Sequence, residues 1–563
     1  MLPAYGKVVN RIDRKDAAII ILLSVVFLSV ATFNVGNTKI PSSKWRTRPE
    51  MVYFNFPSNS DISTIYLFVN GDDNVTAVLS ARVNEGWVNL GYLNAGGFYK
   101  WISYSDLNAK TNELKIQFWA GEDIYEVVFV DESGETIPVE VVRGSDPSDM
   151  DLGRLVDEQG LFEYPPTFKD HTYFDEIYFV RAAQDYLAQR ESSEWTHPPL
   201  GKLILAVGEV FSFSPFGWRF MSVVFATLMI PVVYFAGLII FKTRFAATAS
   251  AFLLVMDFMH FTMGRIGTVD TFLVFFSTVS FVFFYKNFEL LVKKNKPSFL
   301  FMFLGALFAS LAISVKWTSA LGAAGQVFLI VFALLVQSID VGRMVDRLRN
   351  LVKPLAMTFF SFLVGGFGYF ATYIPYLASG HSLMDVYNLQ WIMLNFHSTL
   401  APSHPFASKW VTWPLLLRPM RFSLIYLPGD QVSMINAMGN PFIWWFGLAA
   451  VLIALTMVIK DRQPNFLFLV VVYLFQLLPY AFLSRDTYIY HYYPEVPVLV
   501  LLIAGVLNEF WGEPGARKYI IIYLFVVVIG FAAFYPVISG YPAPSWYFRS
   551  LKWFQAWDFL GVA

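Results

Sequence analysis

Long apolar runs, separated by short polar segments, dominate the chain after about residue 217. A run of about 17–25 apolar residues is long enough to cross the hydrocarbon core of a bilayer as a helix. Eleven runs of this kind are present: 17–33, 218–241, 245–263, 269–287, 298–315, 317–336, 354–373, 440–459, 465–483, 489–507 and 519–537. The pattern therefore predicts a polytopic α-helical membrane protein with about eleven transmembrane helices.

The apolar run 200–213 is short for a transmembrane helix, and the distribution of basic residues decides whether we expect it to cross. Basic residues in short loops favour the cytoplasm. If 200–213 lies along the membrane surface, the basic groups fall on one side: Lys7/Arg11/Arg14/Lys15, Lys242/Arg244, Lys286/Lys293/Lys294/Lys296, Arg343/Arg347/Arg349/Lys353, Lys460/Arg462 and Arg517/Lys518. We therefore expect an interfacial helix at 200–213, a cytoplasmic N-terminus and an external C-terminus.

Residues 37–145 follow a different pattern, in which short runs alternate apolar and polar positions. The clearest are 65–69, 87–90, 114–119 and 124–130, and residues typical of turns separate them. Strands at this spacing indicate a β-sandwich. We expect this domain outside the membrane, between the first span and the segment around Asp175.

The expected organisation has seven parts. They are a cytoplasmic N-terminus with the first transmembrane helix (1–36), an extracytoplasmic β-sandwich (37–145), a linker with an external catalytic loop and interfacial helices (146–216), transmembrane helices 2–7 (217–373), an external loop (374–438), transmembrane helices 8–11 (439–537), and an external interfacial segment (538–563).

Composition limits the classes of partner and of chemistry that the protein can use. The chain is 56% hydrophobic and 15% charged, whereas soluble domains carry about 25% charged residues. A net charge of -1 gives no electrostatic reason to expect nucleic acid as a partner, but the apolar surface implies contact with membrane lipids. The absence of Cys excludes disulfides, thiolate catalysis and Cys-ligated metals.

Asp175 and Glu176 form the first candidate catalytic group, after the aromatic residues Tyr173 and Phe174. Charges beside a bilayer are costly and usually mark a site. Asp175 is a candidate general base, although an acidic pair at a helix start also serves as a cap. The functional reading is favoured by the segment Thr196–Lys202, which brings His197 and Lys202 to the same side of the membrane on a backbone that its prolines stiffen.

Further polar residues are expected near the same face. Lys202 meets a phosphate or extends to the lipid headgroups, and Arg265 with Asp270 forms either a helix-holding pair or a phosphate contact. The complete set of candidates for binding the donor phosphate or sugar is His197, Lys202, Arg219, Arg265, Asp270, Lys316, His397, Arg485 and His491. His197, His397 and His491 match no metal-ligand spacing, so we expect no metal.

Taken together, a carboxylate that activates a hydroxyl and cations that hold a phosphate suit the transfer of a sugar from a lipid phosphate to an acceptor. The sequence also resembles the protein O-mannosyltransferase (dolichyl-phosphate-mannose–protein mannosyltransferase) family, a branch of the GT-C membrane glycosyltransferases. The resemblance covers roughly 150–540 and is carried by 174–176, 197–202, 219–222, 316–317, 403–415, 439–445 and 490–494.

The resemblance implies a polyprenyl (dolichyl) phosphate mannose donor, Ser/Thr hydroxyls of proteins as acceptors and an extracytoplasmic active site, with no cofactor. It places Asp175 at the family's catalytic Asp, with inversion at the sugar carbon by single displacement. Glu176, Arg219 and Arg265 are then expected to organise acceptor and donor. A phosphate leaves as a stable anion, so one base and several cations suffice.

The chain departs from the family pattern in two places. The loop 374–438 is too short for the trefoil-type domain of eukaryotic members. In this respect the chain is similar to prokaryotic members, which favours a plasma membrane over the endoplasmic reticulum. The β-sandwich, which resembles discoidin-like, galactose-binding modules, is an insertion. It leaves open a glycan or lipid acceptor, as in aminoarabinose transferases, and a non-enzymatic transporter or sensor. Polar residues gathered at one face argue against transport. An oligomer is compatible with the sequence.

Overall fold

The computed structural model describes residues 12–71, 74–119, 123–146, 149–294, 296–339, 344–399, 404–483 and 485–561. The chain divides into two compact units. The helical unit consists of residues 1–33, 178–210 and 218–563, and the β unit consists of residues 34–177 and 211–217. Each is described by itself.

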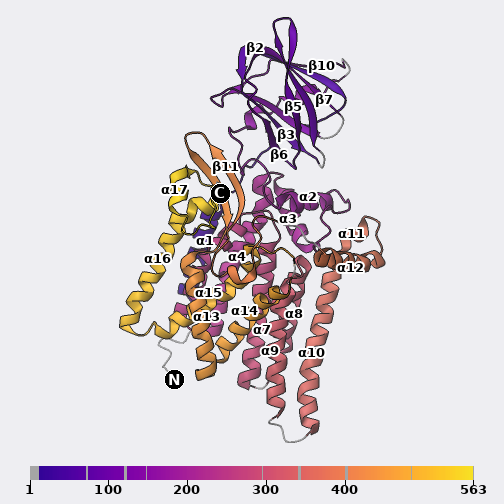
Figure 1. Ribbon diagram of the computed structural model, residues 1–563. Helices are drawn as coiled ribbons and strands as arrows, with labels where there is room; N and C mark the ends of the chain where they lie inside the picture. Colours follow the sequence, from indigo (N-terminus) through magenta and orange to yellow (C-terminus); the bar gives the residue numbers. More distant parts are fainter. Residues whose placement is uncertain are drawn as a thin grey trace. The chain divides into compact units, whose positions relative to one another are not determined.

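Two antiparallel five-stranded sheets form the β unit (Figure 1). One has the order β1-β8-β3-β6, with β9 paired to β8, and the other has the order β10-β2-β7-β4-β5. The strands are β1 (Trp45–Arg46), β2 (Glu50–Ile62), β3 (Thr64–Asn70), β4 (Val75–Val83), β5 (Gly86–Ala95), β6 (Lys100–Tyr104), β7 (Ala109–Phe118), β8 (Asp123–Val130), β9 (Thr136–Ile137) and β10 (Val141–Gly144).

One hydrophobic core joins the two sheets. It contains Phe54 and Leu114 from one sheet and Leu67 and Phe129 from the other, all fully buried. Alternating side chains of each strand reach this core, which is the pattern that the sequence shows. The antiparallel β domain is thus confirmed.

The segment after β10 packs on the β unit rather than leaving it. It contains two short 3₁₀ helices, η1 (Leu152–Leu155) and η2 (Gln159–Leu161). Leu152 and Leu155 are buried in the same core as the strands. The Gln159 side chain donates a 3.1 Å hydrogen bond to the carbonyl of Val127 on β8, so this segment covers one side of that strand.

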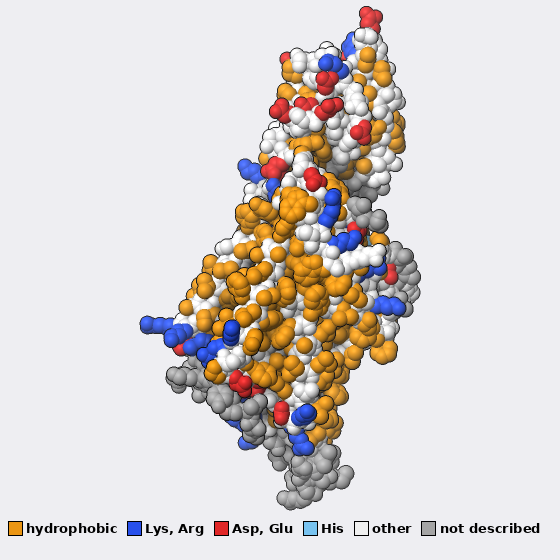
Figure 2. All heavy atoms as spheres, turned by 60° about the vertical axis from the view of Figure 1, so that its left-hand side comes forward, with side chains coloured by type: hydrophobic (Ala, Val, Ile, Leu, Met, Phe, Trp, Pro, Cys, Tyr) orange, Lys and Arg blue, Asp and Glu red, His pale blue; other side chains and the backbone are white. Residues whose placement is uncertain are grey.

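Nine helices within the described residues are long and apolar enough to span a membrane. They are α1 (Arg14–Thr32), α4 (Pro215–Phe241), α7 (Asp270–Lys294), α9 (Ser319–Ile339), α10 (Met344–Ala371), α13 (Pro441–Asp461), the run of α14 (Pro464–Leu477) with η4 (Leu478–Phe482), the run of η5 (Ile489–Glu495) with α15 (Val496–Phe510), and α16 (Pro514–Ser539). Figure 2 shows that hydrophobic side chains cover most of one face of this unit, as expected for a surface in lipid.

Two more predicted spans are shorter apolar helices, α5 (Arg244–Val255) and α8 (Phe299–Val315). The prediction of one helix over 245–263 is wrong, because α5 ends at Val255 and α6 (Phe258–Met263) begins a new one. Asp257 causes the break: its carboxylate accepts a 3.0 Å hydrogen bond from the His260 N–H and so caps α6.

Polar contacts mark two opposite ends of the helical unit. At one end, Arg244 at the start of α5 forms a 2.7 Å ion pair with Asp16 at the start of α1. At the other end, Arg265 just after α6 donates to the carbonyls of Ala31 and Phe33, where α1 ends. The α5–α6 pair therefore runs the length of α1. Of the basic residues used for orientation, Lys7, Arg11, Arg343, Arg347 and Arg349 have no described side chains.

Helix α3 (Leu200–Phe211) has 12 residues, or about 18 Å at 1.5 Å per residue, which is too short to cross a bilayer. It is not among the candidate spans, in agreement with the sequence. In Figure 1, α3 lies with α11 (Ile374–Ala378) and α12 (Leu383–Thr399) at one end of the long helices. The remaining elements are α2 (Glu176–Leu187), η3 (Trp410–Thr412), β11 (Met420–Leu427), β12 (Gln431–Ala437), β13 (Ala543–Pro544) and α17 (Ser545–Ser550).

Candidate active site

Asp175 stands at a tight turn immediately before α2, at the edge of the β unit. Phe174, before it, has φ of +51°, a left-handed conformation that is a real outlier for a bulky residue. The fully buried carboxylate of Glu176 accepts a 3.1 Å hydrogen bond from the backbone N–H of Tyr173. Glu176 thus closes the turn, and Asp175 is left half-buried. Strain of this kind is concentrated at functional sites.

A buried ion pair anchors the loop before α3. The Nζ of Lys202, which is 1% exposed, lies 2.7 Å from Oε2 of Glu194 and donates to the carbonyl of His197 at 2.8 Å. Oε1 of Glu194 lies 3.0 Å from Nδ1 of His197. Burial alone would raise the pKa of Glu194, but the charges of Lys202 and His197 outweigh it and lower that pKa below its usual value.

His397, on α12, links this loop to Arg485. Its Nε2 lies 2.8 Å from the carbonyl oxygen of Thr196, which can only accept, so Nε2 carries the proton. Its Nδ1 lies 2.7 Å from Nη1 of Arg485, which can only donate. The neutral imidazole therefore bridges the two segments, with its ring 5.3 Å from that of His197.

Burial lowers the pKa of both histidines. Burial, followed by the charge of His197, lowers the pKa of His397 to about 4, so His397 is neutral at neutral pH. Burial also lowers the pKa of His197, assisted by the charges of Lys316 and Lys202, although Glu194 opposes the shift.

Lys316 completes the group that we call the basic cluster, which consists of His197, Lys202, Lys316, His397 and Arg485. It lies just after α8 and forms a 3.0 Å ion pair with Asp270 at the start of α7, and its ammonium lies 5.7 Å from the ring of Tyr490. Lys202 and Lys316 therefore each have a carboxylate partner. Within the described part of the chain, Arg485 forms no ion pair, and its hydrogen bonds go to His397 and the carbonyl of Asp486.

The other predicted residues lie in different settings. His491 is nearly buried in an aromatic stack, 4.6 Å from the ring of Tyr490, and its Nδ1 bonds to the backbone of Tyr488. Arg265 donates to carbonyls of α1 and α16, which ties helix ends together. Arg219 is fully buried in the first turns of α4. The described ion-pair partner of Asp270 is Lys316.

A large open hollow lies beside Arg485, with about 1500 Å³ of empty space. Its lining includes two further cations, Lys409 and Arg418, and the aromatic residues Trp410 and Tyr480. Arg485 is the member of the basic cluster that lines this hollow. Cations and aromatic faces together suit a sugar phosphate.

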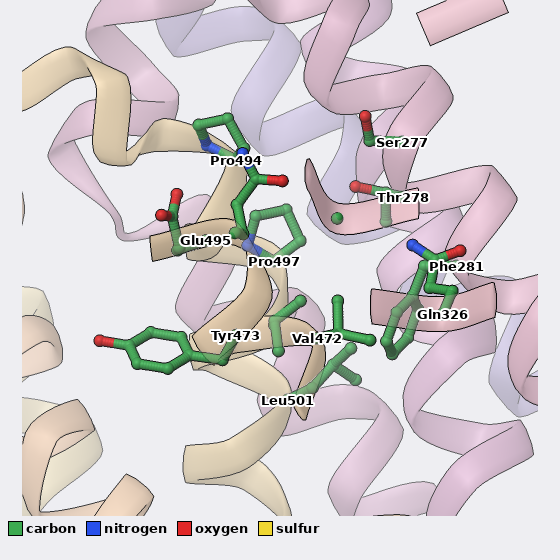
Figure 3. Close-up of a pocket in the computed structure, with 13 residues that line it drawn as sticks. Ser277, Thr278, Phe281, Gln326, Val472, Tyr473, Pro494, Glu495, Pro497 and Leu501 are labelled. Atoms are coloured by element: carbon green, nitrogen blue, oxygen red, sulfur yellow. The ribbon is translucent and has the colours of Figure 1, made fainter. Parts of the chain in front are cut away.

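A second pocket, of about 430 Å³, lies among the helices (Figure 3). Its lining includes Thr278, Gln326, Tyr473 and the fully buried Glu495, both of whose carboxylate oxygens have no hydrogen-bond partner. None of the described residues that line it is Lys or Arg. A phosphate anion does not suit this pocket, whereas the hollow beside Arg485 offers it cations.

Family models match two consecutive parts of the chain. Residues 208–379 match the model described as dolichyl-phosphate-mannose-protein mannosyltransferase, and residues 382–557 match the C-terminal four-transmembrane region of protein O-mannosyltransferase. The chain belongs to the protein O-mannosyltransferase family. This is the family that the sequence resembles, and the matched residues include Lys316, His397 and Arg485 of the basic cluster.

Related proteins agree with this membership. The polyprenol-phosphate-mannose–protein mannosyltransferase of Corynebacterium glutamicum is 26% identical over 435 residues, covering 64% of this chain and 81% of its own. That of Mycobacterium tuberculosis H37Rv is 25% identical over 431 residues, covering 64% and 80%. The Saccharomyces cerevisiae Pmt1–Pmt2 protein O-mannosyltransferase complex bound to the sugar donor has 13% identity and a TM-score of 0.57, covering 69% of this chain and 89% of that chain, which shows the shared fold.

Sequence reasoning missed Glu194. It stands three residues before His197, just outside the segment 196–202 that was singled out for its His and Lys. Only the fold brings its carboxylate to Lys202 at 2.7 Å. The available signal was a lone acidic residue at i−3 from a histidine in a chain with few charges.

Proposed function

We propose that this protein transfers mannose from a polyprenyl phosphate mannose to Ser and Thr hydroxyls of proteins, with the donor phosphate bound at Arg485 of the basic cluster. Membership of the family supports the reaction, and the printed names of the bacterial relatives support the donor and the protein acceptor. Asp175 is the general base.

One observation carries the placement of the phosphate. Of the three cations in the basic cluster, Lys202 and Lys316 already have carboxylate partners, whereas Arg485 bonds only to neutral groups. A guanidinium binds phosphate through two parallel N–H groups. Its Nη1 is oriented by the neutral His397, and the remaining N–H groups are available to the hollow that Arg485 lines.

The proposed transfer requires only the Asp175 carboxylate and the Arg485 guanidinium. The acceptor hydroxyl oxygen attacks the anomeric carbon of mannose from the face opposite the phosphate, its proton passes to the Asp175 carboxylate, and the bond from that carbon to the phosphate oxygen breaks. The polyprenyl phosphate leaves with one additional negative charge. Arg485 stabilises this developing charge, so no acid is required to protonate the leaving group. The sugar carbon is inverted in one displacement.

Glu176 acts as a positioning residue in this proposal. Its carboxylate is occupied by the Tyr173 N–H, which fixes the turn that presents Asp175. The left-handed Phe174 belongs to the same turn. Arg265, bound to three backbone carbonyls at two helix ends, keeps the membrane helices together at the same end as Lys316 and Asp270.

We also propose eleven membrane crossings with an extracytoplasmic site in a prokaryotic plasma membrane. The nine long helices, α8 and the α5–α6 pair supply the crossings. Lys242, Lys286 and Lys293 surround Glu289 at the end of the bundle where α7 finishes, opposite to the end that holds Asp270 and Lys316. Basic residues favour the cytoplasm, so the site faces outward.

The placement of the phosphate is tested by measuring the affinity of the purified protein for polyprenyl phosphate without mannose. We expect Arg485→Gln to weaken binding about 10-fold or more, since a hydrogen bond to a charged group contributes about 1.5–3 kcal/mol. Arg549→Gln is the matched control, because Arg549 is an exposed arginine of α17 that bonds to Ser545. Unchanged affinity in a folded Arg485→Gln protein would remove the phosphate from this site.

A further inference from the structure

Three carboxylates converge in the β unit, and none of them belongs to the basic cluster or to the turn of Asp175. They belong to Glu126 on β8 and to Asp157 and Glu158, which lie between η1 and η2. One oxygen from each lies within 4.8 Å of the others. Two oxygens on opposite sides of a Ca²⁺ ion are roughly 5 Å apart, because each lies about 2.3–2.6 Å from the ion. The three carboxylates are therefore close enough to share one cation.

Glu126 supplies the independent observation. Its side chain is fully buried, and its Oε1 atom has no hydrogen-bond partner. Its Oε2 accepts a 2.8 Å hydrogen bond from the backbone N–H of Glu158, which holds the carboxylate against the other two acids. A buried charge is normally paired or bound to a metal. No Lys, Arg or His in the described part of the chain forms an ion pair with these three residues.

Three carboxylates gathered without a cation repel one another. A bound divalent cation offsets this repulsion, because it is the largest local charge at such a site. The acids are not equally hidden: Asp157 is exposed and Glu158 is half-buried, which gives an ion a path from solvent.

The surroundings already orient the two outer acids. Glu158 accepts hydrogen bonds from the backbone N–H groups of Ser42 and Ser43, at 2.5 and 2.9 Å. Asp157 accepts a 2.7 Å hydrogen bond from the Ser43 hydroxyl. In known metal sites, hydrogen bonds of this kind orient the side chains that bind the metal directly. They join the chain before β1 to the segment between η1 and η2.

We infer that Glu126, Asp157 and Glu158 bind a divalent cation, Ca²⁺ in preference to Mg²⁺. All the ligands are hard oxygens, and Ca²⁺ accepts the irregular arrangement of 6–8 oxygens that carboxylates and water provide, whereas Mg²⁺ demands near-ideal octahedral geometry at about 2.0–2.1 Å. The ion ties the η1–η2 segment to β8 and so stabilises the part of the chain that leads to Asp175. This inference is independent of the proposed sugar transfer.

The test is Ca²⁺ binding by the full-length protein in detergent after treatment with EDTA. We expect Ca²⁺ binding, measured by titration calorimetry, to saturate below about 10 mM Ca²⁺, because extracellular modules bind Ca²⁺ with dissociation constants of about 10⁻⁴–10⁻³ M. We also expect a higher thermal midpoint with Ca²⁺. Glu126→Gln should weaken binding at least about 10-fold, in line with the loss of a ligand. In EDTA, Glu126→Gln should melt no lower than wild type, because the amide oxygen can still accept the hydrogen bond from the Glu158 N–H.

Glu85→Gln is the matched control, since Glu85 is an exposed acid of the β4–β5 turn in the same unit. It should keep wild-type binding. If Glu126→Gln does not fold, Asp157→Asn replaces it, because Asp157 is exposed and its loss should leave the fold intact while weakening Ca²⁺ binding. No binding by wild type, equal binding in the ligand variants, or equal affinity for Mg²⁺ would overturn the inference.

Discussion

At the scale of single residues, the site is built from groups whose charges are already matched, with Arg485 as the exception. Glu194 pairs with Lys202, Asp270 pairs with Lys316, and His397 is neutral. Excess positive charge is thereby concentrated on one guanidinium. This arrangement favours a ligand that brings its own negative charge to one place, such as a phosphate.

The Glu194–Lys202 pair makes a prediction about stability. Glu194→Gln leaves the ammonium of Lys202, which is 1% exposed, without its counter-charge. Removing one partner of a buried pair costs about 3–5 kcal/mol, so we expect a clearly lower thermal midpoint for Glu194→Gln and for Lys202→Met. The double variant should lose much less than the sum of the two. Additive losses in this double-mutant cycle would show that the pair is not coupled.

Glu194 also shows what the sequence could not provide. The motif around His197 was predicted as part of the site because His and Lys beside a bilayer are costly. The role of Glu194 depends on a contact with Lys202, eight residues later, that exists only once α3 has turned the chain. Likewise, the bridge from His397 to Thr196 joins residues 201 positions apart, beyond the reach of any local pattern.

At the scale of elements, hydrophobic periodicity predicted most of the helices, and it failed where a polar side chain interrupts a run. The break between α5 and α6 is such a case. Asp257 caps α6 and also accepts a 2.7 Å hydrogen bond from the Trp444 indole, on α13. The Trp444 indole, which also holds the Asp257 carboxylate, lies 187 residues away, beyond the reach of any local pattern.

The interfacial position of α3 is tested by labelling, which is simple because the chain has no Cys. If α3 does not cross, Glu191→Cys before it should react in intact cells with a membrane-impermeant maleimide, and Lys294→Cys at the end of α7 should not. If α3 crosses, every later element is inverted and both positions react. Reaction of Lys294→Cys after permeabilisation is the control for its accessibility.

At the scale of the whole molecule, the chain forms two units that place their apolar side chains differently. The helical unit presents apolar side chains outward, as Figure 2 shows, and forms ion pairs at helix ends. The β unit has a conventional hydrophobic core between two sheets. The sequence predicted both, because their patterns differ in period. The resemblance of the β unit to discoidin-like modules stays a prediction.

Family membership supports the reaction. Two family models cover most of the chain after residue 207, and the same region contains Arg485 with its hollow. Asp175 lies before the matched region, in a turn closed by Glu176. Its role as the base is therefore the claim on which the mechanism depends most.

The most direct test is transfer of labelled mannose from polyprenyl phosphate mannose to a Ser/Thr-rich peptide by the purified protein in lipid. We expect transfer by wild type and by Glu163→Gln, an exposed acid that pairs with Lys169. Asp175→Asn should be slower by about 10²–10⁴-fold, the usual contribution of a general base, while its affinity for polyprenyl phosphate is unchanged. Transfer by Asp175→Asn at the wild-type rate, or transfer by wild type only to a glycan or lipid acceptor, would contradict the account.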